Sequence, residues 1–254
     1  MNIQYSEAGL AKETSPSFMN RVGVDRAFNP TDWQRILFRE FEANLLSETR
    51  SFPCIFGVAG FRADQLRYSF LDPLNARNVA AVLGPYLSES RGFGPNTSLV
   101  IFSRPGQVEP LEAYERRFWR LLCDLAVEDH RPWPIAIPEE LDNPRWEFCF
   151  AGEPIFVVCN TPAHVSRQSR RASSFMITFQ PRWVFDSILD NEVSAERAFR
   201  KVRDRLRRYD FLAPSPALGR YGDSGNREFA QYFLRDVNEA VDCPFHRLGV
   251  ERSK

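Results

Sequence analysis

The sequence predicts an α+β fold, in which helices flank a mixed sheet that includes an antiparallel hairpin, within a single domain. Three observations support this class. Residues 75–87 and 111–125 carry apolar side chains at helical spacing. Residues 97–103 form a short apolar run that is typical of a buried strand. Residues 146–159 alternate apolar and polar side chains on either side of a Gly-Glu-Pro turn, as a β-hairpin does.

The amino-terminal 28 residues are polar and mixed, and we expect them to be loosely held. The remainder, residues 29–254, has no internal repeat and no clear linker, which predicts one domain. At 254 residues the chain is long enough to bury a substantial core.

The first predicted helix begins near Thr31, which can cap it, while Gln34 can return the hydrogen bond three residues later. Pro53 ends that helix, and a strand-like apolar run continues through Phe61. Farther along the chain, residues 174–182 are predicted as a strand and residues 194–210 as a basic helix. The sequence suggests no particular role for the part beyond residue 182.

Charge and composition exclude some classes of partner. Lysine plus arginine and aspartate plus glutamate number 33 each, so no net field attracts nucleic acid or an anionic membrane. The 22 phenylalanines are many for this length. Large flat side chains suit a hydrophobic core and also the walls around a planar apolar ligand, and composition alone favours the core.

The five cysteines are widely spaced and include no Cys-x-x-Cys pair, so we expect neither a disulfide framework nor a zinc cluster. The amino terminus has no basic stretch followed by an apolar block, which argues against a secretory signal. No apolar run is long enough to cross a bilayer. The expectation is a cytoplasmic protein in a reducing compartment.

Three histidines limit the choice of metal ligands. His130 lies in a proline-rich stretch and is expected at the surface. His246 and Cys243 have a spacing that a metal ion could accept, but two ligands do not make a site. His164 is the best candidate of the three because of the residues around it.

Thr161 and the proline after it suit the start of a helix, which would place His164 in the first turn. Arg167 and Arg171 would then share its face, with Arg170 nearby. An imidazole beside several guanidinium groups could hold an anionic cofactor with a metal at its centre, since the arginines would pair with carboxylates. The alternative is an exposed basic helix with an incidental histidine.

Cys54 stands at the start of an apolar stretch. A lone cysteine in such a place is usually a buried, inert thiol. A thiolate can also bind haem iron, and it then donates electron density that favours O–O cleavage. No neighbouring base or lysine in the sequence suggests a nucleophile of the usual kind. The residues alone favour the inert thiol.

Four stretches follow one another along the chain: FPCIFG from Phe52, LRYSF from Leu66, WEFCFAG from Trp146 and NTPAHVSRQSR from Asn160. Together, and in this order, they resemble the YqcI/YcgG family with its Phe-Pro-Cys motif. The resemblance runs to about residue 182 and covers about half the chain. Characterised members of this family are haem-dependent N-hydroxylases of free amino acids and related amines, particularly of the guanidinium group of L-arginine.

The resemblance implies haem b as cofactor, bound through the side chain of His164 or Cys54. The choice between the two stays open. His164 is slightly preferred, because its expected helix also supplies Arg167, Arg170 and Arg171 as partners for the haem propionates. Thiolate ligation by Cys54 would suit oxygen activation. The family's motifs also fall on the following positions of this sequence: Phe52, Pro53, Arg67, Tyr68, Asn160 and Pro162.

An enzyme of this kind would use dioxygen or peroxide, and an electron-donor protein could be a partner. A cationic substrate needs a carboxylate in a partly dry pocket, because an unpaired buried cation is costly. Glu147 is the first candidate and Asp72 the second, while Arg67 could bind the α-carboxylate of an amino acid. Two alternatives stay open: a haem carrier or sensor without catalysis, and a binding module without a cofactor.

Overall fold

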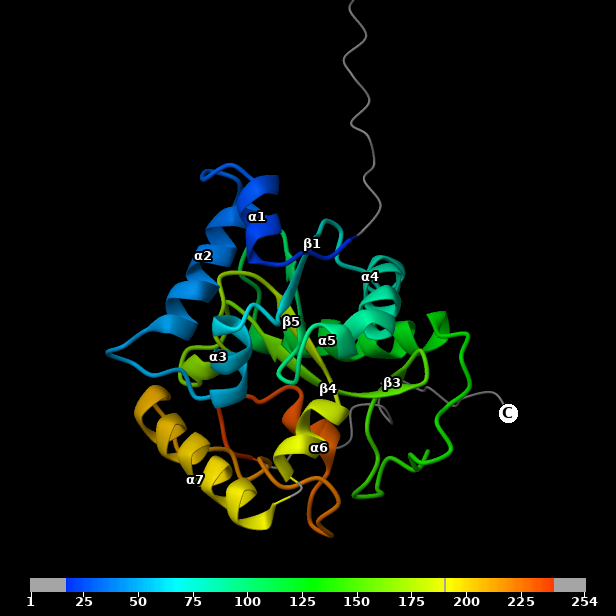
Figure 1. Cartoon of the computed structure of the whole chain (residues 1–254). Helices are drawn as coiled ribbons and strands as arrows, with labels where there is room; N and C mark the ends of the chain where they lie inside the picture. The colour runs from blue at the N-terminus through cyan, green and yellow to red at the C-terminus, as the bar shows by residue number, and fades with distance from the viewer. Residues whose placement is uncertain (1–16, 190, 240–254) are drawn as a thin grey trace, which may run out of the picture.

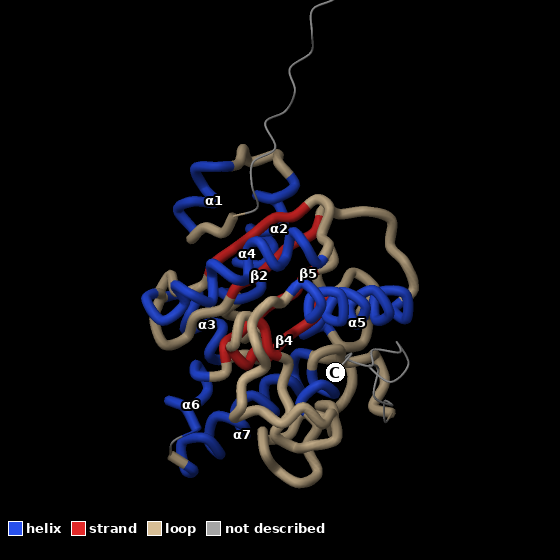
Figure 2. Tube along the Cα trace, turned by 90° about the vertical axis from the view of Figure 1, so that its right-hand side faces the viewer, coloured by secondary structure: helices blue, strands red, loops and turns tan. Residues whose placement is uncertain are grey.

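The computed structural model describes residues 17–189 and 191–239. A five-stranded mixed sheet, in the strand order β1-β2-β5-β4-β3, forms the centre, and helices lie on both sides of it (Figures 1 and 2). The predicted α+β class is therefore confirmed. Within the described ranges, none of the helices is both long enough and apolar enough to cross a membrane.

The strands are β1 (Arg67–Leu71), β2 (Leu99–Ser103), β3 (Cys149–Phe150), β4 (Glu153–Asn160) and β5 (Met176–Pro181). β1 and β2 are parallel, and the other pairs are antiparallel. The predicted hairpin is present as β3 and β4. Ala151 and Gly152 form its turn at φ values of 53° and 79°. Two successive positive φ values match the right-handed twist of the flanking strands.

The helices are α1 (Arg21–Ala27), α2 (Trp33–Leu46), α3 (Ile55–Arg62), α4 (Ala76–Glu89), α5 (Leu111–Glu128), α6 (Trp183–Leu189) and α7 (Glu192–Tyr209). The short 3-10 helices are η1 (Ser90–Gly92), η2 (Gln168–Arg170) and η3 (Glu228–Gln231). The predicted helices at 75–87, 111–125 and 194–210 are confirmed as α4, α5 and α7. α2 is also confirmed, although its N-cap is Asp32 rather than Thr31.

The strand-like run that ends at Phe61 is a helix, α3, so that prediction was wrong. A short apolar run does not distinguish a strand from a buried helix. Two features favour the helix here, one within the segment and one in its contact with a distant loop. Cys54 caps it, because its Sγ accepts the N–H of Gly57. Gly60 lets the helix approach the loop before β2, since a Cβ at this position would lie 2.3 Å from the carbonyl oxygen of Asn96.

Residues 17–28 are packed against the body rather than loosely held. The backbone of Met19 exchanges two hydrogen bonds with Tyr68 in β1, at 2.9 and 2.8 Å. Val24 in α1 is fully buried in the core. Residues 1–16 of the expected polar segment lie outside the described residues.

The two faces of the sheet carry separate cores, because successive residues of a strand point to opposite faces. Ile101, Val157 and Ile177 pack with α4 and α5 in one core. Val100 and Met176 pack with α1, α2 and α3 in the other. Beside this second core the sheet continues under α7, and that part of the face borders a cavity.

Candidate functional site

The cavity has a free volume of about 290 Å³. Its floor is formed by side chains on one face of three strands: Val100, Phe156, Val158, Met176 and Thr178. α2 and α3 contribute a side wall that includes Phe41, Leu45, Cys54 and Phe56. The lining is therefore largely apolar, as expected for a site that binds a small molecule.

α7 covers the cavity. Its apolar side chains lie at helical spacing and line the cavity: Ala195, Ala198, Phe199, Val202 and Leu206. The helix is attached to the Phe-Pro-Cys segment, because Arg205 Nη1 donates to the carbonyl oxygen of Phe52 at 2.8 Å. The rings of Phe52 and Tyr209 also pack edge to face. No role was expected for this helix, although the spacing of its apolar residues is the signal of a buried face.

Cys54 provides the thiol of the cavity wall. Its Sγ accepts the N–H of Gly57 at 3.3 Å, at the amino-terminal end of α3. Burial raises the pKa of this thiol, while the N–H groups of Gly57 and Phe56 lower it. The positive charges of Arg170 and Arg205 also lower it. Burial has the largest effect, so the pKa of this thiol is raised overall and the sulfur is a neutral thiol in the free protein. The N–H donors and the nearby cations would stabilise the thiolate that binding to a metal requires.

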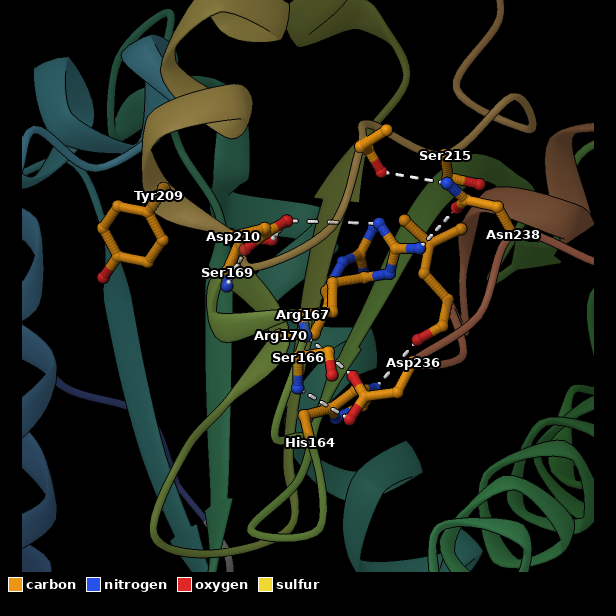
Figure 3. Close-up of polar contacts among 12 residues, drawn as sticks. His164, Ser166, Arg167, Ser169, Arg170, Tyr209, Asp210, Ser215, Asp236 and Asn238 are labelled. Carbon is orange, nitrogen blue, oxygen red and sulfur yellow. Dashed lines mark hydrogen bonds and ion pairs between the residues drawn. The ribbon is translucent and has the colours of Figure 1, made fainter.

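Residues 161–171 do not form the predicted α-helix. They form a loop that contains only η2, and its ends pair as an isolated bridge between Thr161 and Arg171. Asp236 accepts the N–H groups of three successive loop residues, Val165, Ser166 and Arg167 (Figure 3). These contacts hold the loop to a distant segment, so the expected common helical face of His164, Arg167 and Arg171 does not exist.

His164 is fully buried and does not line the cavity. Its Nε2 lies 2.8 Å from the carbonyl oxygen of Leu234, and its Nδ1 lies 2.9 Å from Oγ1 of Thr161. Because a carbonyl oxygen only accepts, Nε2 carries the proton and Nδ1 accepts from the threonine hydroxyl. Burial lowers the pKa of His164 to about 4. Neither ring nitrogen has a lone pair free for a metal in this arrangement.

Arg167 is almost fully buried and lines the cavity. Its Nε donates to the carbonyl oxygen of Arg235, and its Nη2 donates to Oδ1 of Asn238, both at 2.8 Å (Figure 3). Its Nη1 has no hydrogen-bond partner among the described residues and lies 4.0 Å from Oδ2 of Asp210. A buried guanidinium with an unpaired N–H at a cavity wall is suited to bind an anion.

Arg170 also lines the cavity, and it donates to the carbonyl oxygens of Tyr232 and Gln231. Burial lowers the pKa of Arg170 to about 10. Arg171 does not line the cavity, because its guanidinium donates to the carbonyl oxygens of Pro162 and His164. The structure thus brings Cys54, Arg167 and Arg170 together and leaves Arg171 outside.

Two of the expected substrate-binding residues do not line the cavity. Arg67 donates to two backbone carbonyl groups and lies over the ring of Phe93, 3.9 Å from its centroid. Asp72 is exposed and pairs with Arg104. The third, Glu147, is fully buried and contacts the cavity wall through Arg182, whose Nη1 lies 3.5 Å from its Oε1.

The remaining expectations concern metal ions. His130 is exposed, as expected. His246 and Cys243 lie outside the described residues. Within the described ranges, no group of three or more histidine, cysteine, aspartate or glutamate side chains could hold a metal ion.

Comparisons with known proteins place these residues in context. The model of the YqcI/YcgG family matches residues 41–246. This range includes α7 and residues 235–238, which accept hydrogen bonds from Arg167. It therefore extends well beyond residue 182, where the resemblance in the sequence ended. No solved structure matches the chain.

Three curated relatives align over most of the chain. "Uncharacterized protein YcgG" of Bacillus subtilis is 42% identical, with 91% of this chain and 94% of the relative covered. "Uncharacterized protein YqcI" of the same organism is 43% identical, with 85% and 89% covered. A Streptomyces lavendulae protein named "Putative N(omega)-hydroxy-L-arginine synthase DcsA" is 30% identical, with 98% and 95% covered. The chain belongs to the YqcI/YcgG family.

Proposed function

We propose that the chain is a haem-dependent N-hydroxylase of a free amino acid or related amine, and that its substrate group is the guanidinium of L-arginine. The observation that carries the proposal is the largely apolar cavity that holds in its wall the Cys54 thiol and the Arg167 guanidinium, whose Nη1 has no hydrogen-bond partner among the described residues. The name of the Streptomyces lavendulae relative supports the choice of arginine as the first substrate to test.

The residues of the cavity fit a haem in three respects. The walls are apolar, as a porphyrin ring requires. A thiol with an N–H donor to its sulfur is available as an iron ligand. The unpaired N–H of Arg167 can pair with a propionate carboxylate. The free volume of about 290 Å³ lies at the small end of the range for sites that bind small molecules, so a group as large as haem would need the cavity to widen.

In this proposal Cys54 rather than His164 binds the iron. Cys54 faces the cavity, whereas both ring nitrogens of His164 are already hydrogen-bonded away from it. Arg167 and Arg170 bind the propionates, and α7 excludes water from the reacting centre. Bound haem would supply the activation of dioxygen or peroxide, which amino-acid side chains do not perform.

Two accompanying proposals concern the surroundings. An electron-donor protein is a partner if dioxygen rather than peroxide is the oxidant. A reducing, cytoplasmic location is consistent with the free thiols of the four described cysteines, Cys54, Cys123, Cys149 and Cys159.

The test is a haem titration followed by absorption spectra of the reduced protein under carbon monoxide. The wild type should bind haem stoichiometrically and show the strongly red-shifted Soret band of thiolate ligation. Cys54→Ser should lose that band, and His164→Gln should keep it in the fraction that folds. Protein that stays colourless with added haem would refute the proposal, and a normal Soret position lost only in His164→Gln would reassign the ligand.

Catalysis is tested separately with L-arginine, oxygen and a reductant. The proposal expects a product that is one oxygen atom heavier than arginine. Haem binding without any product would favour a carrier or sensor, and the absence of haem binding would favour a cofactor-free binding module.

A further inference from the structure

A second polar group of side chains lines the cavity at the end away from Asn160, where Gln180, Arg182 and Glu228 lie. The antiparallel register separates the two ends, because Asn160 pairs with Met176 whereas Phe156 pairs with Gln180. Four residues along β4 correspond to about 13 Å at a strand's ordinary rise. The cavity thus has two chemically distinct ends.

At this end one guanidinium group forms ion pairs with two buried carboxylates. Arg182 Nη1 lies 3.2 Å from Oε1 of Glu228 and 3.5 Å from Oε1 of Glu147. Glu228 lines the cavity, and Glu147 is fully buried beside it. With both carboxylates ionised, the cluster would carry an uncompensated negative charge in a site of low polarity, which is costly.

The groups around Glu147 do not remove this imbalance. Asp186 of α6 adds a further negative charge, and Tyr221 and Tyr232 are neutral phenols. Burial raises the pKa of Glu147 to about 8, against the opposing effect of Arg182. Near neutral pH the Glu147 carboxyl group therefore carries a proton most of the time.

The hydrogen bonds of the two carboxylates differ. Oε2 of Glu228 accepts from Nδ2 of Asn226 at 2.9 Å and from Nε2 of Gln231 at 3.2 Å. Oε2 of Glu147 is buried and has no hydrogen-bond partner among the described residues. Buried polar atoms are rarely left unpaired in native proteins. With both carboxylates ionised, the cluster is short of one positive charge and one N–H donor, and a guanidinium or an ammonium supplies both.

We propose that the cluster of Glu147, Arg182 and Glu228 is the subsite for the cationic nitrogen group of the substrate, and that the arriving cation displaces the proton of Glu147 to solvent. The charges balance, because the neutral carboxyl group becomes a carboxylate as the cation enters. An anionic group is disfavoured here and is directed to Arg167 at the other end. The identity of the ligand, a guanidine or amine, rests on the proposed function.

The test is isothermal titration calorimetry of L-arginine at pH 7, repeated in buffers that differ in ionisation enthalpy. Wild-type protein should release close to one proton for each arginine bound. Below pH 8 the affinity should rise about tenfold for each pH step of one, because the proton competes with the cation. Citrulline, which carries a neutral urea in place of the guanidinium, should bind weakly and without proton release.

Variants separate the two carboxylates. Glu147→Gln, which keeps the shape of the side chain, should bind arginine without proton release and with an affinity independent of pH. Glu228→Gln should weaken binding at least tenfold. Glu139→Gln is the matched control, because it removes the same charge from an exposed position outside the cavity. It should leave both the affinity and the proton release unchanged.

The outcomes distinguish this subsite from the proposed function. Arginine binding without proton release in the wild type, or equal binding by Glu228→Gln, overturns the subsite even if the protein binds haem. Failure of L-arginine, L-lysine and agmatine all to bind overturns it as well. If the protein takes up no haem but binds arginine with proton release, the proposed subsite is supported and the proposal of a haem-dependent enzyme is refuted.

Discussion

His164 uses both of its ring nitrogens to join a loop to the carboxyl-terminal segment. Its partners, Thr161 and Leu234, lie three and seventy residues away in the sequence. The ring is fully buried and neutral, since burial lowers its pKa to about 4. His164, which looks like a metal ligand in the sequence, therefore has a structural role in this protein.

The neutral state of His164 makes the stability of the protein depend on pH. Because its folded pKa of about 4 lies below the ordinary 6.5, its contribution is complete above pH 6.5 and is lost as the pH falls towards 4. The difference corresponds to on the order of 3 kcal/mol in the free energy of unfolding. Urea unfolding at pH 7, 5 and 4 should show the stability advantage of wild type over His164→Gln shrinking by roughly this amount. A constant difference would contradict the buried neutral ring.

Arg167 and Arg171 form a matched pair, because one lines the cavity and the other does not. Arg167→Gln removes the guanidinium whose Nη1 has no hydrogen-bond partner among the described residues, and it should weaken haem binding at least tenfold, since a charge-assisted hydrogen bond to a propionate is lost. Arg171→Gln should change the affinity less than twofold. Titration of haem into both variants provides the comparison. Equal effects would show that the unpaired N–H does not bind the cofactor.

Among the elements, α7 forms the cover of the site. It presents apolar side chains to the cavity, and its outer face carries the exposed basic residues Arg197, Arg200, Lys201, Arg207 and Arg208. Its contact with the Phe-Pro-Cys segment, through Arg205 and Phe52, ties the cover of the cavity to the residues next to the thiol. Position and attachment together make this helix the boundary between the cavity and solvent.

Ala198→Trp tests the cover directly. The large side chain would occupy the cavity and leave the helix intact, so haem uptake should fall at least tenfold while the melting temperature changes little. Arg197→Trp places the same residue on the exposed face of the helix and should leave uptake unchanged. Normal haem uptake by Ala198→Trp would place the ligand site elsewhere.

At the scale of the whole molecule, the cavity joins parts that are distant in sequence. Its walls come from α2, α3, the sheet, α7 and the segment around η3. A ligand that binds this assembled cavity binds only the folded state, and it therefore stabilises the protein by mass action.

Haem at a concentration one hundred times its dissociation constant should add about 2.7 kcal/mol to the free energy of unfolding. For a chain of this size, the melting temperature should rise by roughly 5–10 °C. Differential scanning calorimetry with and without haem measures this rise, and Cys54→Ala at the same haem concentration should show a smaller one. An unchanged melting temperature in the wild type would mean that no haem site forms.

Local periodicity in the sequence was sufficient to predict most elements. α4, α5, α7 and the hairpin follow from the spacing of apolar residues and from turn residues, because those patterns depend on neighbours within one element. The family resemblance drew attention to Cys54, which the structure places in the cavity wall. The charge balance argued against nucleic acid and anionic membranes as partners. The cysteine spacing argued against a disulfide framework and a zinc cluster.

Other features depended on contacts that no local pattern contains. Residues 55–62 lie as a helix against the loop before β2, where Gly60 closely approaches the carbonyl oxygen of Asn96. The loop of residues 161–171 is held by Asp236, so its expected helix is absent. Glu228 could be recognised as a candidate substrate-binding residue only in the folded structure, which places it beside Arg182. The sequence by itself determined most of the elements and pointed to the family, while the tertiary structure decided which side chains meet, because a buried polar group takes its partner from whatever part of the chain packs beside it.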